Sequence, residues 1–184
     1  MATDRTFIRK ESAVYAQVLL EATQAAGTTF EVAGQLDGAY EIIRGNIELR
    51  TTLLDRMIPI ETRIAIINEV FEGFDPVLLA VLDVMLKRDQ LMILGKVTET
   101  FTNLAEDALK AVFIDVTTVV ALDDALRSKI KEKYSAQFGR DVLLREHIDP
   151  AIVGGIILSA HGISIDASIT TQLEKARHAL SQSR

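Results

Sequence analysis

The hydrophobic periodicity of the chain changes once, near residue 111, and this change constrains the fold more than any other feature. Across residues 7–110, apolar side chains recur every three or four positions, which is the spacing of amphipathic helices. Beyond residue 110 the spacing becomes two, with Val112, Ile114 and Val116 at alternate positions, as in a β-strand. The sequence therefore predicts an α+β chain in two parts.

The first part, residues 1–110, is predicted to be a bundle of about six helices. Gly27 is placed to end the first helix, and Pro59 interrupts the pattern between the third and fourth. Asp75 and Pro76 suit the N-cap and the first position of a fifth helix. The short connections are typical of helical bundles.

The second part, residues 111–184, is predicted to be a small α/β domain with the order β-α-β-β-β-α. Its first helix starts after Asp123 or Asp124 and ends at Gly139. The segments "VLLREHI", "GGIILSA" and "ISID" supply the later strands, and His161-Gly162 makes a two-residue turn. A last helix carries Ile169, Leu173, Ala176 and Leu180.

Composition narrows the range of functions. The chain has 184 residues, 48% hydrophobic, and a net charge of −6, which disfavours non-specific binding of nucleic acid. It contains no cysteine, which excludes disulfides and thiolate metal sites. The longest apolar run, "VLLAVL", is too short to span a bilayer, and the N-terminus lacks the apolar core of a signal peptide. We expect a soluble, cytosolic protein with no direct membrane insertion.

Two groups of residues contain types that occur in ligand-binding or catalytic sites. Gly154 and Gly155 lack the spacing of a dinucleotide loop and are expected to let a strand bend or another backbone approach. His161, Asp166 and Ser168 have the types of a hydrolase triad, but no nucleophile elbow surrounds the serine. A turn and a helix cap explain these three residues more simply. We predict no catalytic residue, no metal site and no cofactor.

Two helices carry more apolar residues than one core-facing stripe requires. Either these helices are central in the bundle, or they form a groove for an amphipathic helix of a partner. The residues in question are Tyr15, Leu19 and Leu20 on the first helix, and Val77, Val81 and Val84 on the fifth.

The segment "VLLREHIDPAIVGGIIL" resembles the C-terminal signature of the delta subunit of F-type ATP synthases, the family of the oligomycin-sensitivity-conferring protein. The resemblance rests on Asp149, on the Gly154-Gly155 pair and on the apolar residues around them. "ISIDASI", with Asp166 and Ser168, is similar to the continuation of that signature. "SAVYAQVLLEA", "IPIETRIAIINEVF" and "MLKRDQLMIL" resemble family segments in the helical part, so that the resemblance covers the whole chain.

The resemblance implies a non-catalytic stator subunit, present in one copy per complex. In that family, the N-terminal bundle binds the N-terminal helix of an alpha subunit, and the C-terminal domain binds b-type subunits of the peripheral stalk. The implied location is the cytoplasmic face of the bacterial plasma membrane, as a peripheral part of the complex. We expect the six apolar residues of the first and fifth helices to contact the alpha-subunit helix.

Two rival interpretations belong to other classes. A small cytosolic hydrolase would use the region of Ser168, His161 and Asp166. An RNA-binding α/β module would need a basic, aromatic sheet face, and the predicted strands offer Phe113 and little else.

Overall fold

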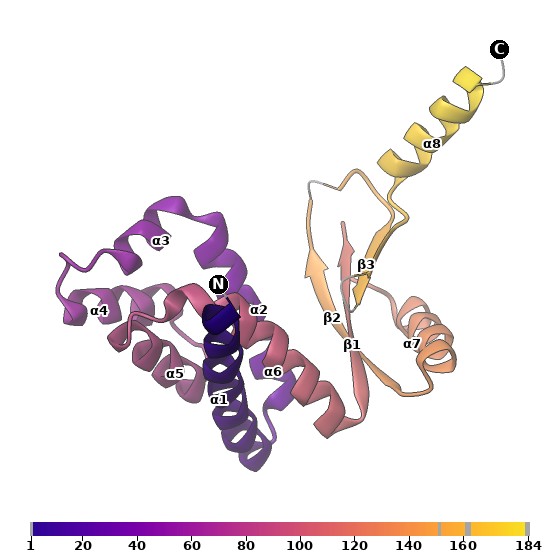
Figure 1. Ribbon diagram of the computed structural model, residues 1–184. Coiled ribbons are helices and arrows are strands. Elements are labelled where there is room, and N and C mark those ends of the chain that lie inside the picture. Colours follow the sequence, from indigo (N-terminus) through magenta and orange to yellow (C-terminus); the bar gives the residue numbers. More distant parts are fainter. Residues whose placement is uncertain (1, 151, 161–162, 183–184) are drawn as a thin grey trace. The chain divides into compact units, whose positions relative to one another are not determined.

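The computed structural model describes residues 2–150, 152–160 and 163–182 and divides the chain into two compact units. The first unit is Met1–Asp107 and the second is Ala108–Arg184, so the boundary lies in the last turn of a helix. The first unit is helical and the second is built around a four-stranded sheet (Figure 1). The predicted fold class, a helical bundle followed by a small α/β domain, is confirmed.

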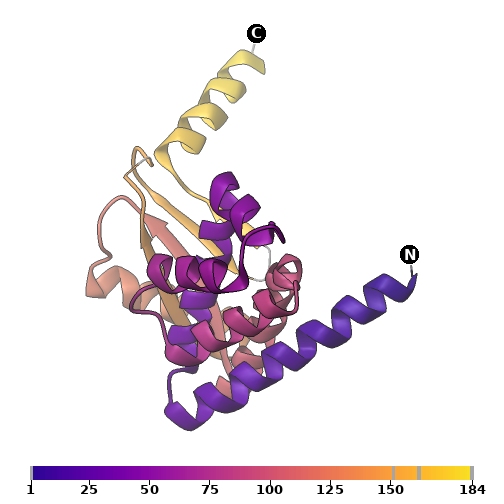
Figure 2. The ribbon, with the colours of Figure 1, turned by 90° about the vertical axis from the view of Figure 1, so that its left-hand side faces the viewer.

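The N-terminal unit contains six α-helices and one turn of 3₁₀-helix in its described residues. The order is α1 (Ala2–Ala26), α2 (Thr29–Gly45), α3 (Ile47–Leu54), α4 (Ile60–Val70), α5 (Pro76–Lys87), η1 (Leu91–Ile93) and α6 (Leu94–Leu109). Helix α1 is the longest of them and extends beyond the helices that it packs against (Figure 2).

The helix ends follow the local chemistry of the sequence. Gly27 has a φ of +74° and ends α1, as predicted. The Asp75 carboxylate accepts a hydrogen bond from the Val77 amide at 2.8 Å, and Pro76 occupies the first turn of α5. The Asp75 amide also donates to Gln35 Oε1 at 2.7 Å, which ties the start of α5 to α2.

Helix α5 supplies the centre of the N-terminal core. Its Leu78, Leu82 and Met85 side chains are completely buried, and it packs against α1, α4 and η1. Phe71 and Phe101 are also completely buried, and they are the largest such side chains in the described chain. Burial of one such side chain is worth roughly 1.5–3 kcal/mol.

The C-terminal unit is a mixed sheet with one face covered by a helix. Its elements are β1 (Ala111–Thr118), α7 (Asp124–Phe138), β2 (Asp141–Ile148), β3 (Ile156–Ala160), β4 (Ile163–Asp166) and α8 (Ile169–Gln182), which confirms the predicted order. The strand order is β2-β1-β3-β4. Strands β1 and β2 are parallel and are joined through α7, whereas the other two pairs are antiparallel.

Helix α7 is anchored at both ends and packs on the sheet. The Asp123 carboxylate accepts from the Leu126 amide at 2.6 Å, and Gly139 ends the helix with a φ of +65°. Ile130 and Tyr134 of α7 cover alternate residues of the strands, which leaves the core of this unit on one face of the sheet. The strand residues buried there are Val112, Ile114, Val116 and Val142.

The glycine pair brings two segments of backbone into contact. At Gly155, where φ is +93°, a Cβ atom would lie 2.5 Å from the Ala167 carbonyl oxygen and 2.7 Å from Ser168 Cα. At Gly154 a Cβ atom would lie 2.6 Å from Cδ1 of Ile169, and the Gly154 carbonyl accepts from the Ile169 amide at 2.9 Å. The pair therefore permits the close backbone approach that the sequence indicated.

Replacing Gly155 by alanine should destabilise the chain by about 2 kcal/mol or more, because φ is unfavourable and the new methyl group meets backbone. The free energy of unfolding is measured by urea denaturation followed by circular dichroism. Gly38→Ala is the matched control, because a Cβ atom there meets nothing within 4 Å and the residue lies inside α2. The control should gain up to about 1 kcal/mol. Equal stability of Gly155→Ala and the wild type would contradict the close approach.

Candidate partner-binding surfaces

Helix α1 carries an exposed row of large apolar side chains. Phe7, Val14 and Val18 are 56%, 58% and 51% exposed. Their spacing of seven and four residues places them on one face of the helix. An exposed apolar row of this length on a helix indicates a surface that a partner covers.

Helix α5, which packs directly against α1, also has apolar side chains at the surface. Val84 is 41% exposed, and Val77 is partly exposed at the same face one heptad earlier. Among the described residues, α1 and α5 thus form a pair of neighbouring helices that both present apolar side chains outside the core.

Four of the six residues predicted to line a groove instead lie in the core of the bundle. Tyr15, Leu19, Leu20 and Val81 are at most 8% exposed. Their helices are central, so the residues pack inward and cannot offer surface to a partner. The Tyr15 hydroxyl donates to Gln90 Oε1 at 2.6 Å, which attaches α1 to the segment before η1.

Hydrophobicity alone does not separate Val14 and Val18 from the buried apolar residues of α1, because all of them fit one broad apolar stripe. The buried face also contains small and polar residues, namely Ser12, Ala16 and Thr23. Small residues let neighbouring helices approach closely, and their period of three to four marks the same face. Reading that period would have placed Val14 and Val18 on the opposite face.

The start of α8 is fixed by the Asp166–Ser168 turn. The Asp166 carboxylate accepts from the Ser168 amide and from the Thr171 hydroxyl, both at 2.8 Å, while Ser168 Oγ accepts from the Thr171 amide at 3.3 Å. Hydrogen bonds from Ser168 and then Thr171 lower the pKa of Asp166 below its ordinary value. Ser168 is therefore a helix cap. His161, the third member of the possible hydrolase triad, lies outside the described residues.

Asp149, the other family-signature residue, follows the end of β2. Its amide donates to the Thr118 carbonyl at 2.9 Å, and its carbonyl accepts from the Ile152 amide at 3.3 Å. It thereby holds the chain that leaves the sheet between β2 and β3.

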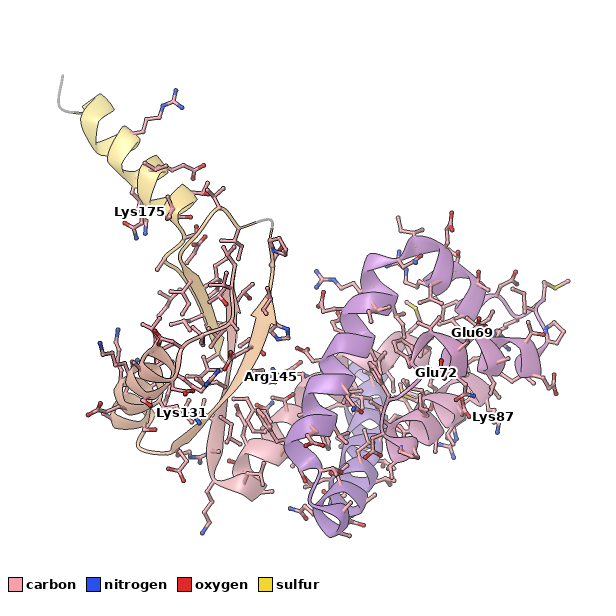
Figure 3. All side chains as sticks on the ribbon, turned by 180° about the vertical axis from the view of Figure 1, so that it is seen from behind. Glu69, Glu72, Lys87, Lys131, Arg145 and Lys175 are labelled. Carbon is pink, nitrogen blue, oxygen red and sulfur yellow. The ribbon has the colours of Figure 1, made fainter. Side chains whose placement is uncertain are left out.

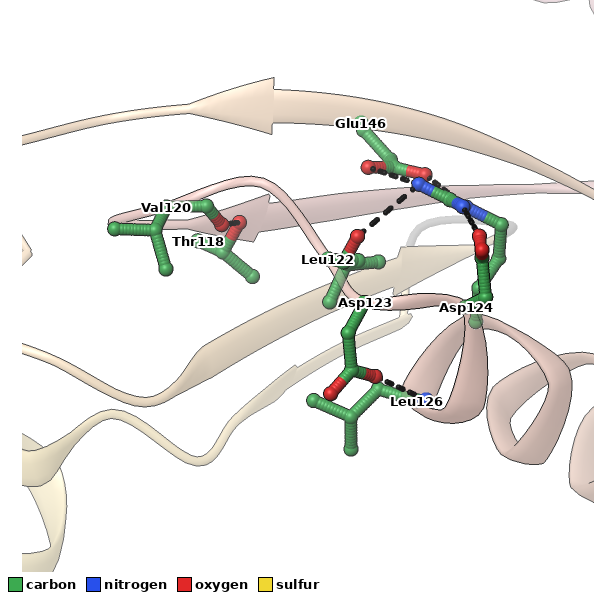
Figure 4. A network of polar contacts seen from close by, with 8 residues as sticks. Thr118, Val120, Leu122, Asp123, Asp124, Leu126 and Glu146 are labelled. Carbon is green, nitrogen blue, oxygen red and sulfur yellow. Dashed lines mark hydrogen bonds and ion pairs between the residues drawn. The ribbon is translucent and has the colours of Figure 1, made fainter.

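An ion-pair network joins α7 to β2. Arg127 donates from Nε to Glu146 Oε1 at 2.7 Å and from Nη2 to the Leu122 carbonyl at 3.2 Å, and it also pairs with Asp124 (Figure 4). The hydrogen bond from Arg127 lowers the pKa of Glu146, and the same bond raises the pKa of Arg127. On the sheet, Arg145 of β2, which is labelled in Figure 3, donates from Nη2 to Asp115 Oδ2 of β1 at 2.8 Å.

Helix α8 presents large apolar side chains at the surface. Ile169 and Leu173 are 47% and 65% exposed and lie four residues apart on one helical face. Figure 1 shows α8 extending from its end of the sheet, and Figure 3 shows Lys175 projecting from the helix. A solvated helix with an apolar row is unstable alone, which indicates a second surface suited to a partner.

Two features are absent from the described part of the chain. No group of three or more His, Cys, Asp or Glu residues there is arranged to hold a metal ion. Within the same residues, no helix has the length and apolar character needed to cross a membrane.

These apolar rows on two separate units define a protein whose surfaces are suited to binding other proteins. Its fold is similar to a chain in the cryo-EM structure of the mitochondrial ATP synthase hexamer of Toxoplasma gondii. The TM-score is 0.52 and the sequence identity 16%, over 92% of this chain and 96% of that one.

The family described as "ATP synthase delta (OSCP) subunit" matches residues 12–180. The ATP synthase subunit delta of Rhodopirellula baltica is 30% identical over 163 residues, which cover 88% of this chain and 72% of that one. The Myxococcus xanthus subunit delta is 29% identical over 172 residues, or 91% and 94% of the two chains. The chain belongs to the ATP synthase delta (OSCP) subunit family. It is a structural subunit of the complex, and nothing in these relatives supports a hydrolase.

Replacing Arg127 by methionine should raise the pKa of Glu146 toward its ordinary value of 4.5. Because the folded-state pKa is lowered, Arg127 stabilises the folded chain above about pH 4.5, and this stabilisation disappears as the pH falls through the folded-state pKa. An NMR titration of the Glu146 carboxyl carbon measures the shift. Lys131→Met is the control and should move the pKa less, because Lys131 makes the smallest contribution. Equal shifts in both variants would contradict the assigned cause.

Proposed function

We propose that this chain is the stator subunit that links the catalytic head of an ATP synthase to its peripheral stalk. A rotor that turns inside the head exerts torque on it, and a static link that holds at both ends resists this torque. Family membership supports the assignment to the complex, and the exposed apolar row on α1 beside α5 is the observation that carries the binding role.

The N-terminal unit binds the N-terminal helix of an alpha subunit on the surface of α1 and α5. Val14 and Val18 supply the α1 side, and Val77 and Val84 supply the α5 side. An amphipathic helix laid on such a surface buries apolar area on both partners, which is a recurring mode of peptide recognition. Tyr15, Leu19, Leu20 and Val81 support this surface from the core.

The C-terminal unit binds b-type subunits of the peripheral stalk through α8. Ile169 and Leu173, which are 47% and 65% exposed in the isolated chain, would be buried in that contact. The cap formed by Asp166 and Ser168 fixes where α8 begins and thus positions these two side chains.

In this proposal one copy of the subunit serves each complex, as a peripheral component on the cytoplasmic face of a bacterial plasma membrane. Its contribution to ATP synthesis coupled to hydrogen-ion transport is mechanical, because it holds the head still while the rotor turns.

A calorimetric titration of the full chain with a peptide spanning the alpha-subunit N-terminus tests the N-terminal contact. We expect one-to-one binding with a negative heat-capacity change, which marks the burial of apolar surface. The double variant Val14→Asp, Val18→Asp should bind about tenfold more weakly or worse, since it places two charges in the contact.

Ile47→Asp is the matched control, because Ile47 is an equally exposed apolar residue on α3. It should leave the affinity for the alpha-subunit peptide unchanged. Equal weakening by the control, or unchanged affinity of the double variant with the fold intact by circular dichroism, would contradict the assignment of this surface.

A further inference from the structure

The N-terminal unit has an apolar hollow that is lined by none of the residues assigned to the alpha-subunit helix. It consists of two neighbouring cavities of ≈ 220 Å³ each, which share Leu54, Leu91 and Met92. We call these two cavities together the arginine groove. Met92 lines both cavities and is 75% exposed, although it is a large apolar residue. Methionine side chains adapt readily to the shape of a bound partner.

Positive charge gathers around this groove in a unit that is otherwise acidic. Residues 1–107 contain 17 Asp and Glu against 10 Lys and Arg, of which seven are arginines. Four of those seven line the two cavities, Arg44 and Arg50 in one and Arg56 and Arg63 in the other. Asp89 is the one acidic residue among the lining residues. The groove is therefore a local positive site on a negative surface.

The positive charge is only partly compensated within the described chain. Arg50 donates to the Arg44 carbonyl at 3.4 Å and forms no ion pair there. Arg44 pairs with Glu41 at 3.1 Å, but both side chains are more than half exposed, so the pair is weak. An incoming carboxylate could bind Arg50 directly and compete with Glu41 for Arg44.

The other end of the groove has a buried arginine below it. Arg63 is 7% exposed and donates from Nη1 to the Leu53 carbonyl at 3.2 Å and to Asp89 Oδ1 at 3.4 Å. Its Nε atom is buried with no hydrogen-bond partner among the described residues. Asp89 also pairs with Arg56 at 3.2 Å, so one carboxylate is shared by two cations.

Asp89 is held in a conformation that is costly for a residue other than glycine. Its φ is +53°, in the left-handed region, and this angle directs the chain from α5 into η1. The turn at Asp89 places its carboxylate at the edge of the cavity, where it pairs with Arg56 and Arg63.

We propose that the arginine groove is a second docking surface, which binds an acidic peptide segment of another protein. The segment places an apolar side chain against Leu54, Leu91 and Met92 and carboxylates against Arg44 and Arg50. Planar guanidinium groups recognise carboxylates with two parallel hydrogen bonds, which gives this contact specificity for Asp and Glu. Charge complementarity selects this occupant over a basic one. The proposal goes beyond the stator contacts above and does not rest on them.

The test uses the full chain and a fluorescent, helix-forming peptide of about 15 residues, a length at which an isolated helix is marginal in water. The peptide has Glu residues on both sides of a Leu and Met stripe, and a second peptide has Lys in place of every Glu. Fluorescence anisotropy measures both affinities. The acidic peptide should bind, and the Lys peptide should bind at least about tenfold more weakly.

The variant Arg44→Glu, Arg50→Glu should weaken binding of the acidic peptide by about tenfold or more. Arg9→Glu, Lys10→Glu on α1 is the matched control with the same change of charge, and it should have less than about a twofold effect. Arg44, Arg9 and Lys10 are exposed and Arg50 is partly exposed, so circular dichroism should show an intact fold in both variants. Binding of the alpha-subunit peptide should be unaffected by the groove variant, which separates this proposal from the proposed function.

Several results would overturn the proposal. They are the absence of binding by the acidic peptide, equal binding of the two peptides, and an equal loss in the control variant. Loss of self-association in the Arg44→Glu, Arg50→Glu variant, measured by analytical ultracentrifugation, would also overturn it, because the occupant would then be a second copy of the chain.

Discussion

The packing of α5 among α1, α4 and η1 is the interaction on which the N-terminal unit depends. Helix α5 is apolar on nearly every side, so it has no stable place in water and must be enclosed by other helices. Leu78, Leu82 and Met85 satisfy that constraint in the core, while Val84 remains at the surface. The same helix therefore holds the bundle together and presents part of the surface proposed for the alpha subunit.

The C-terminal unit is organised by a different constraint, which is the parallel pairing of β1 and β2. Parallel neighbours require a crossover, and α7 provides it while covering the apolar face of the sheet. The Arg127–Glu146 pair then joins α7 to β2, and the close approach at Gly155 joins the β3 side to the start of α8. Outside these links, Ile169 and Leu173 of α8 remain largely exposed.

Much of this architecture could be predicted from the sequence, because its signals are local. Gly27 ends α1 and Gly139 ends α7, as predicted. Asp75 caps the start of α5, and Asp123 caps the start of α7. Local sequence does not determine which side chains face a partner, because this depends on how distant segments pack together. Tyr15 fits an apolar row and is buried by α5 and the segment before η1, which are far away in the sequence.

The arginine groove had no sequence signal at all. Arg44, Arg50, Arg56 and Arg63 are spread over three helices and a loop, and only the fold gathers them around Leu54 and Met92. A spacing rule identifies residues on one element, whereas this surface depends on how several elements meet.

A sedimentation experiment tests whether this chain connects the catalytic head to the membrane-bound stalk. ATP synthase membranes are stripped of the head and of this subunit, and purified head is then added back with or without the chain. We expect the head to sediment with the membranes in a one-to-one ratio with the chain, and much less of the head to sediment without the chain. Equal sedimentation of the head in the absence of the chain would show that the chain is not the connection.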